Sequence, residues 1–148
     1  MLGSALRECP EDLWQATLWE DPSAPGFSEF WYVAYHALFW LDLYLSGSSD
    51  GFVPPAPFTL DELDPSGVLP PRMYTREELT DYLAHSAEKC RVTFKNLTDE
   101  QAQRTHQIGS RRRTMSFAEL LLYNMGHVRE HAAQLSMFLG QRRNLAST

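Results

Sequence analysis

The sequence has few lysines and few cysteines, and each shortage excludes a class of protein. Lys89 and Lys95 are its only lysines, and the formal net charge is -6 at pH 7. An acidic chain is a poor match to a general nucleic-acid binder, so we expect no nucleic-acid partner. Cys9 and Cys90 lie far apart and form no CxxC zinc motif. They suit a reduced, cytoplasmic setting, with a single disulfide between them as the alternative.

Long hydrophobic runs are also missing. No basic segment followed by an apolar run opens the sequence, so we expect no secretion signal. The most apolar stretch, residues 30–45, contains His36 and Asp42 and is too short and too polar to span a membrane. We therefore expect a soluble, cytoplasmic protein with no membrane partner.

Strand patterns are scarce, whereas helical patterns recur along the chain. With 148 residues, 43% of them hydrophobic and 12% aromatic, the chain is expected to form one globular domain over residues 1–148. Apolar spacing of three and four predicts long helices over about 29–45, 75–96 and 116–140, after short helical pieces at 2–8 and from Pro10. This pattern predicts an all-α helical bundle.

Local signals set the ends of these helices. Residues 47–51, rich in glycine and serine, end the first long helix. Capping boxes beginning at Thr75, Thr98 and Ser116 open the second long helix, a short helical turn and the last helix. The tail after Gln141 is expected to fray. Residues 109–114 are expected to form a polar loop, with a small hairpin as the alternative.

A proline-rich segment, residues 46–73, connects the first two long helices. Its length permits a crossover, so that these two helices run parallel and the last helix runs antiparallel to both. His36 then lies about 15 Å before the end of its helix, and His127 roughly 16 Å after the start of the last helix. If those helix ends are level, the two imidazoles meet near the middle of the bundle.

His127 and His131 are four residues apart, so they stack on one face of the last helix. By itself this spacing is a weak signal, and two partly buried or surface histidines are the alternative. Together with His36, the pair would supply three neutral imidazoles and leave one coordination position open for water or a thiol, as in catalytic zinc sites. Imidazole suits zinc, nickel and similar ions equally, so the spacing does not choose the metal.

Several other residues are candidates for supporting roles. Three residues could hydrogen-bond a metal-binding histidine and so fix its orientation: Gln134, Asp42 and Glu130. For each of them, a role in helix packing or as a surface charge is the alternative. Arg129, Arg111 and Arg113 could hold the carboxylates of a substrate, although residues 111–113 also fit a solvated loop. The catalytic group itself is not identified by the sequence.

These residues resemble the DinB-like (YfiT-like) metal-binding proteins over about residues 9–140. The resemblance rests on the aromatic segment 31–45 around His36, the proline-rich crossover, and the segment 126–135 with its His-x-x-x-His spacing. It implies a four-helix bundle in up-down-down-up order with a long crossover between helices 2 and 3. It also implies that His36, His127 and His131 bind a divalent metal, often zinc or nickel, and that the protein is a homodimer.

Family members with known chemistry are thiol-dependent enzymes, including bacillithiol S-transferases and the mycothiol-dependent maleylpyruvate isomerase. The resemblance thus implies a metal-dependent hydrolase or thiol S-transferase that acts on a small electrophile with a low-molecular-weight thiol. The alternative is a non-enzymatic, metal-stapled bundle with a role in stress or protein interaction. The chain departs from the family in its short first helix, so either that helix is a stub or a partner chain completes the bundle.

Overall fold

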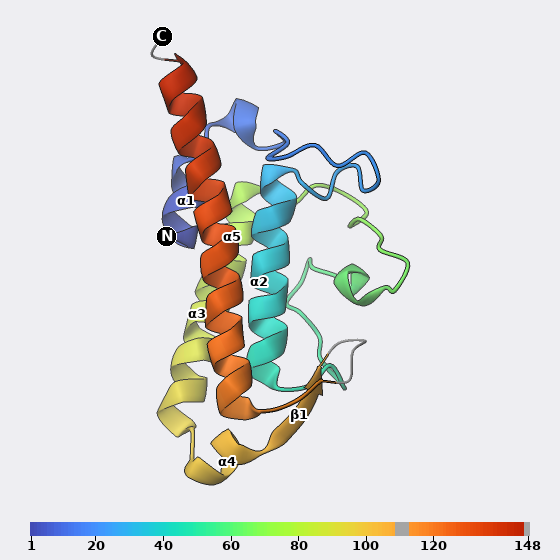
Figure 1. Ribbon diagram of the computed structural model, residues 1–148, viewed down its shortest axis with the longest axis vertical. Helices are drawn as coiled ribbons and strands as arrows, with labels where there is room; N and C mark the ends of the chain where they lie inside the picture. The colour runs from blue at the N-terminus through green and yellow to red at the C-terminus, as the bar shows by residue number, and fades with distance from the viewer. Residues whose placement is uncertain (109–112, 147–148) are drawn as a thin grey trace.

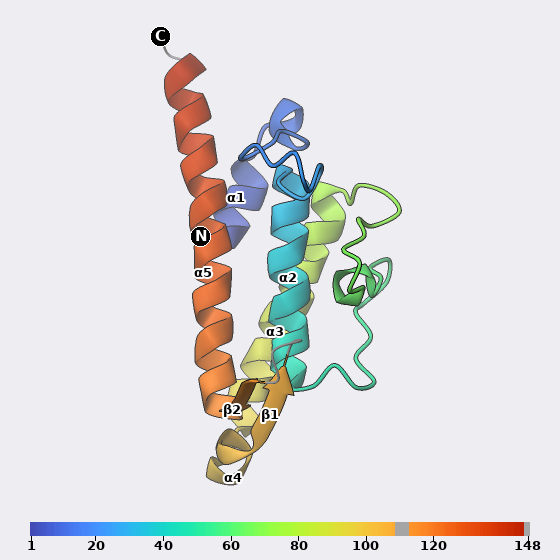
Figure 2. The same cartoon turned by 45° about the vertical axis from the view of Figure 1, so that its right-hand side comes forward.

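The computed structural model describes the backbone of residues 1–108 and 113–146. Its elements in chain order are α1 (Leu2–Glu8), the 3-10 turn η1 (Glu11–Leu13), α2 (Phe30–Ser46), the 3-10 turn η2 (Asp61–Leu63), α3 (Arg76–Asn96), α4 (Asp99–Gln103), β1 (Thr105–Ile108), β2 (Arg113–Ser116) and α5 (Phe117–Ala146). Helices α1, α2, α3 and α5 form a bundle in up-down-down-up order (Figures 1 and 2). The expected all-α bundle and its helix order are confirmed.

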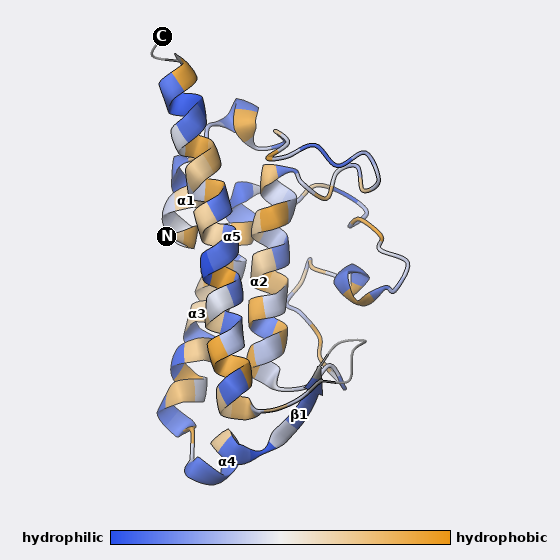
Figure 3. Cartoon of the chain, viewed as in Figure 1, coloured by the Kyte–Doolittle hydropathy of each residue, from blue (hydrophilic) through white to orange (hydrophobic). Residues whose placement is uncertain are grey.

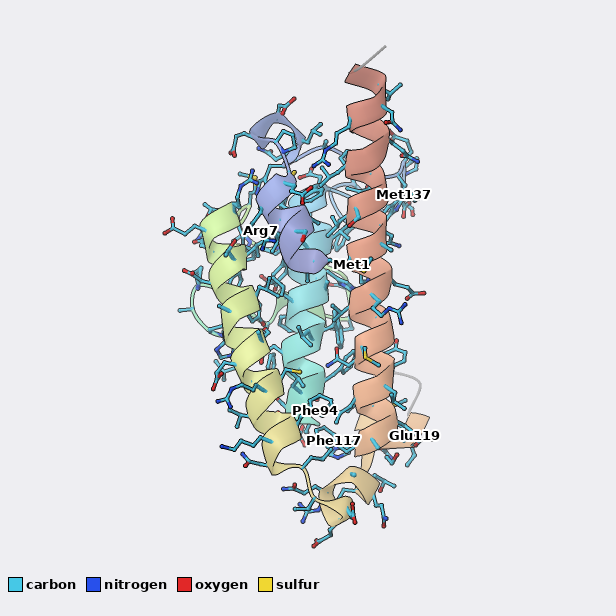
Figure 4. All side chains as sticks on the ribbon, turned by 90° about the vertical axis from the view of Figure 1, so that its left-hand side faces the viewer. Met1, Arg7, Phe94, Phe117, Glu119 and Met137 are labelled. Carbon is cyan, nitrogen blue, oxygen red and sulfur yellow. The ribbon has the colours of Figure 1, made fainter. Side chains whose placement is uncertain are left out.

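Helix α2 lies at the centre of the bundle, between α3 and α5 (Figure 4). Thirteen of its 17 residues are buried, and hydrophobic and neutral colours dominate it in Figure 3. A helix that is apolar on nearly every side is stable only when other elements surround it, which explains its central place. It ends at Gly47, whose φ of 73° favours glycine and whose added Cβ would lie 2.9 Å from His106.

Helix α3 is fastened to α2 by a buried polar cluster in addition to apolar packing. The Asp42 carboxylate is 1% exposed and accepts hydrogen bonds from the Tyr82 hydroxyl at 3.1 Å and the Lys89 ammonium at 2.5 Å. Lys89 also donates to the Asp42 carbonyl and to the Ser46 hydroxyl. Burying a carboxylate is stable only when it is paired in this way, so the cluster fixes how α3 sits on α2.

The expected capping boxes form at the starts of α3, α4 and α5. In the first, Thr75 Oγ1 accepts from the Glu78 backbone N–H at 3.2 Å, and the Glu78 carboxylate accepts from the Thr75 N–H at 2.8 Å. Ser116 and Glu119 exchange the corresponding bonds before α5. Each box satisfies N–H groups that a helix start would otherwise leave without acceptors.

The long crossover, residues 47–75, is held against the bundle by aromatic side chains. Phe58 is 8% exposed and stacks on Tyr82 at a centroid distance of 4.3 Å and on Tyr35 at 5.8 Å. The turn η2 follows directly and lies beside α2 (Figure 2). Anchoring by Phe58 thus brings the acidic residues of η2 next to the middle of α2.

The N-terminal region differs from the expected short helices in one place. The short helix expected to begin at Pro10 is instead the three-residue 3-10 turn η1. The chain turns there to reach residues 21–26, which contain two prolines. Residues 14–30 then form a backbone-bonded loop in which the Leu18 N–H donates to the Ser28 carbonyl at 2.8 Å and Thr17 pairs with Glu29. The Trp14 indole donates to the Tyr74 carbonyl at 3.0 Å and ties this loop to the crossover.

Helix α1 is short and covers only the upper part of the groove between α3 and α5 (Figure 4). Below Met1, a groove of about 550 Å³ is lined mainly by apolar side chains from α2, α3 and α5, including Phe94, Leu121 and Met125. The first helix is thus seven residues long in the described chain, and completion of the bundle by a partner chain stays a prediction.

The C-terminal part also departs from expectation. Helix α5 continues past Gly140 to Ala146, so the predicted fraying after Gln141 is wrong for residues 141–146. The strands β1 and β2 pair antiparallel with Thr105 opposite Ser116, while residues 109–112 between them lie outside the described chain. Cys9 and Cys90 are both free, so no disulfide joins them.

Candidate metal centre

Three histidines from two antiparallel helices converge in the middle of the bundle. His36 comes from α2, and His127 and His131 come from consecutive turns of α5. The ring centroid of His36 lies 5.3 Å from that of His127 and 4.9 Å from that of His131. The ring centroids of His127 and His131 are 4.5 Å apart. One potential ligand atom from each residue lies within 4.8 Å of the others, which is close enough to share one metal ion.

The orientation of the His36 ring is set by Glu62 in η2. His36 Nδ1 lies 2.8 Å from Glu62 Oε2, and because a carboxylate only accepts, Nδ1 is the donor and Nε2 is the nitrogen left to bind a metal. The same carboxylate accepts from the Trp40 indole at 2.8 Å and from the Tyr32 hydroxyl, and its side chain is only 5% exposed. A carboxylate behind an imidazole is a recurrent arrangement at metal sites, where it fixes the tautomer and raises the ligand's basicity.

The two histidines of α5 are arranged with their Nε2 atoms facing each other. His131 Nδ1 lies 2.8 Å from Gln134 Oε1, and its Nε2 lies 3.1 Å from His127 Nε2. His127 Nδ1 is buried and has no hydrogen-bond partner within the described chain. The cluster therefore contains imidazole nitrogens whose lone pairs the protein does not fully use, and a divalent cation would satisfy them.

The electrostatic environment favours the neutral form of the two α5 imidazoles, His127 and His131. Burial, followed by the proximity of His131 and His36, lowers the pKa of His127 to about 4. Burial and the neighbouring His36 also lower the pKa of His131. Burial alone would raise the pKa of Glu62, but the hydrogen bonds from His36, Tyr32 and Trp40 outweigh it and lower that pKa. A neutral imidazole is the form that binds metal, so the donor set fits a borderline divalent ion such as zinc or nickel.

Comparison with known families identifies the family of the chain. A family model described as the DinB superfamily matches residues 1–135. The chain belongs to the DinB superfamily. No curated protein and no solved structure matches it.

The environment of this DinB superfamily site includes two cavities. One is a small pocket of about 220 Å³, lined by His36, His131 and four apolar or aromatic residues, Trp19, Phe27, Tyr32 and Val33. The other, of about 590 Å³, is more open and is lined by His127 together with Tyr123, Arg129 and Glu130, among others. Each histidine of the cluster thus lines one of the two cavities.

The supporting residues suggested by the sequence lie in different places. Gln134 contacts His131, as described above. Asp42 instead faces α3, because six residues of helix rotate the chain by about 600° and leave it roughly 120° away from His36. Its carboxylate binds Lys89 and Tyr82 rather than a histidine of the cluster. Glu130 is exposed and lines the larger cavity.

The arginine candidates are placed only in part. Arg129 is exposed and lines the larger cavity next to His127, and it also borders the apolar groove below α1. Arg111 lies outside the described residues, and Arg113 is described as part of β2 without its side chain. Of the proposed carboxylate-binding residues, Arg129 is thus the one that the structure brings near the cluster.

Sequence reasoning missed Glu62. The sequence does show a turn at residues 59–63 inside a long proline-rich connection, and long connections are often functional. No helical or strand spacing relates Glu62 to His36, which lies 26 positions away. The contact follows from the path of the crossover, which only the folded chain reveals.

None of the helices in the described ranges is long and apolar enough to cross a bilayer.

Proposed function

We propose that this DinB superfamily member binds a divalent metal, zinc or nickel, through His36, His127 and His131. The observation that carries the proposal is the convergence of three imidazoles, one of which, His127, has a buried Nδ1 without a hydrogen-bond partner in the described chain. Within residues 1–108 and 113–146, no other histidine, cysteine, aspartate or glutamate joins this group. Three protein ligands are typical of catalytic sites, whereas structural zinc sites are usually closed by four.

We further propose that the site serves an enzyme, either a thiol S-transferase or a hydrolase, that acts on a small electrophile. When bound, the metal supplies Lewis acidity, which lowers the pKa of a thiol or of water and makes either a nucleophile near neutral pH. Glu62 and Gln134 hold the rings of His36 and His131, so the ligand nitrogens are preorganised. The Arg129 guanidinium at the larger cavity is suited to bind a carboxylate of a small thiol.

The first test is elemental analysis of purified, tag-free protein. The wild type is compared with His36→Ala, His127→Ala and His131→Ala, and with His85→Ala as a matched control. His85 is 45% exposed in its side chain and lies outside the cluster. We expect close to one metal ion per chain in the wild type and in the control, and a large loss in the three cluster variants.

A metal-free wild type that cannot be loaded, or cluster variants that retain the metal, would overturn the metal site. If the metal is present but no thiol or water analogue binds it, the non-enzymatic role of a metal-stapled bundle becomes the better explanation. Thiol binding would instead justify a screen of electrophiles in the presence of small thiols.

A further inference from the structure

The two cavities beside the histidine cluster differ in chemical character. The small one, which we call the aromatic pocket, is defined by Trp19, Phe27, Tyr32 and Val33 together with His36 and His131. The larger one, which we call the polar cavity, borders His127 and includes the charged residues Arg129 and Glu130. The cluster thus borders one cavity that is mainly apolar and one that carries charged side chains.

The walls of the aromatic pocket are fixed by the fold. Trp19 and Phe27 belong to the loop of residues 14–30, whose backbone bonds hold it over the start of α2. The Phe27 ring meets the Tyr32 ring edge-on, with centroids 5.0 Å apart and planes at 76°. Trp19 is 42% exposed, so it forms an outer wall that is less constrained by packing.

The pocket offers few polar groups to a ligand. The Tyr32 hydroxyl already donates to Glu62, which leaves its ring as the available surface. Val33 contributes methyl groups, and the Glu62 carboxylate is itself occupied by three donors. A polar substituent placed here would lose its hydrogen bonds to water without replacement, whereas an apolar one would gain from leaving water.

We propose that the aromatic pocket receives a small apolar substituent, such as a phenyl ring, of the molecule that binds at the three-histidine site. This proposal rests on the proposed function, since it names the class of ligand for the same site. The volume of about 220 Å³ limits the substituent, because sites for drug-sized ligands measure roughly 300–1,000 Å³. Substrates with a large or charged group on this side are excluded, and hydrophilic parts lie in the polar cavity.

The test uses cobalt-loaded protein and two thiol probes of similar acidity, benzyl mercaptan and 2-mercaptoethanol. Cobalt(II) is coloured, and thiolate binding adds a charge-transfer absorption band, so each dissociation constant is read from a titration without an enzyme assay. We expect benzyl mercaptan to bind at least about tenfold more tightly than 2-mercaptoethanol, because its ring leaves water in the pocket. Metal-free protein serves as the blank for nonspecific uptake.

Three variants test whether the preference for benzyl mercaptan arises in the aromatic pocket. Trp19→Ala removes the outer wall and is expected to reduce the preference to about threefold or less, because the ring stays in contact with water. Phe27→Leu keeps the wall apolar but removes the aromatic edge, and it provides a second, milder change. Phe94→Ala is the matched control, since Phe94 is an exposed aromatic residue, 56% accessible, in the groove below α1. Folding and cobalt content are checked for each variant.

The possible outcomes distinguish a failure of the aromatic-pocket proposal from a failure of the proposed metal-site function. Equal affinity for both thiols, or a preference that survives in Trp19→Ala, overturns the aromatic pocket as the specificity site and leaves the open metal position intact. A protein that holds no cobalt, or whose spectrum responds to neither thiol, overturns the proposed function and this proposal with it. A preference lost in Trp19→Ala and kept in Phe94→Ala supports both.

Discussion

Replacement of Glu62 tests whether the crossover organises the metal site. The carboxylate accepts hydrogen bonds from His36, Tyr32 and Trp40 and is 5% exposed. In Glu62→Ala, all three donors lose their acceptor and His36 loses the group that fixes its tautomer. Loss of such a partner behind a metal ligand typically reduces metal affinity by about 10–100-fold. We expect a decrease in that range for Glu62→Ala.

Glu62→Gln tests the effect of the negative charge of Glu62 separately from the effect of its hydrogen bonds. The amide oxygen can still accept from His36 and Trp40, which share one carboxylate oxygen, and the amide nitrogen can donate to the Tyr32 oxygen. Position is therefore preserved while the negative charge is lost. We expect this variant to lose roughly tenfold in metal affinity or less, because the ring orientation survives and only the ligand's basicity falls.

The free energy of unfolding should also decrease more in Glu62→Ala than in Glu62→Gln. Each hydrogen bond to a charged group contributes about 1.5–3 kcal/mol, but Glu62→Ala also removes the cost of burying a carboxylate, which is several kcal/mol. A net loss of about 2–3 kcal/mol in the free energy of unfolding of the metal-free protein is the expected balance of these terms. Urea unfolding of the apo variants measures it, with Glu62→Gln close to the wild type.

Metal affinity is measured by competition with a coloured chelator. Glu100→Gln is the matched control, because Glu100 is an exposed glutamate that pairs with Arg104 on the surface. Unchanged metal affinity in Glu62→Ala would refute the positioning role. Equal losses in Glu62→Ala and Glu62→Gln would show that charge alone matters and that the ring needs no support from the crossover.

Four further outcomes are expected. Gln134→Ala, which removes the acceptor of His131 Nδ1, should weaken metal binding by about tenfold in the same competition assay. Lys89→Met should cost about 3 kcal/mol of unfolding free energy, because it removes the ammonium group that pairs with the buried Asp42 carboxylate. Metal content should not change, and urea unfolding with elemental analysis checks both. Thr75→Ala should lower the unfolding free energy by about 1 kcal/mol through loss of the α3 cap. Chelation should lower it by about 2.7 kcal/mol relative to protein with free metal at 100 times its Kd, as calorimetry would show.

The sequence by itself determined the helices and the histidine ligand candidates. Apolar spacing marks α2, α3 and α5, and the capping boxes at Thr75, Thr98 and Ser116 mark starts that the structure confirms. These signals are local, because a helix start depends on bonds between residues three positions apart. The i,i+4 spacing likewise puts His127 and His131 on one face of a helix, whatever tertiary contacts the helix makes.

Only the tertiary structure decided which groups support and surround the cluster. Asp42 and Glu62 illustrate the difference: a helical position suggested the first as a partner for His36, but its rotation around α2 directs it to Lys89. Glu62 arrives instead from a connection without regular spacing, anchored by Phe58. The aromatic pocket has the same origin, since Trp19 and Phe27 reach α2 through an irregular loop. Contacts made by irregular segments depend on the path of the whole chain, and local sequence patterns do not encode that path.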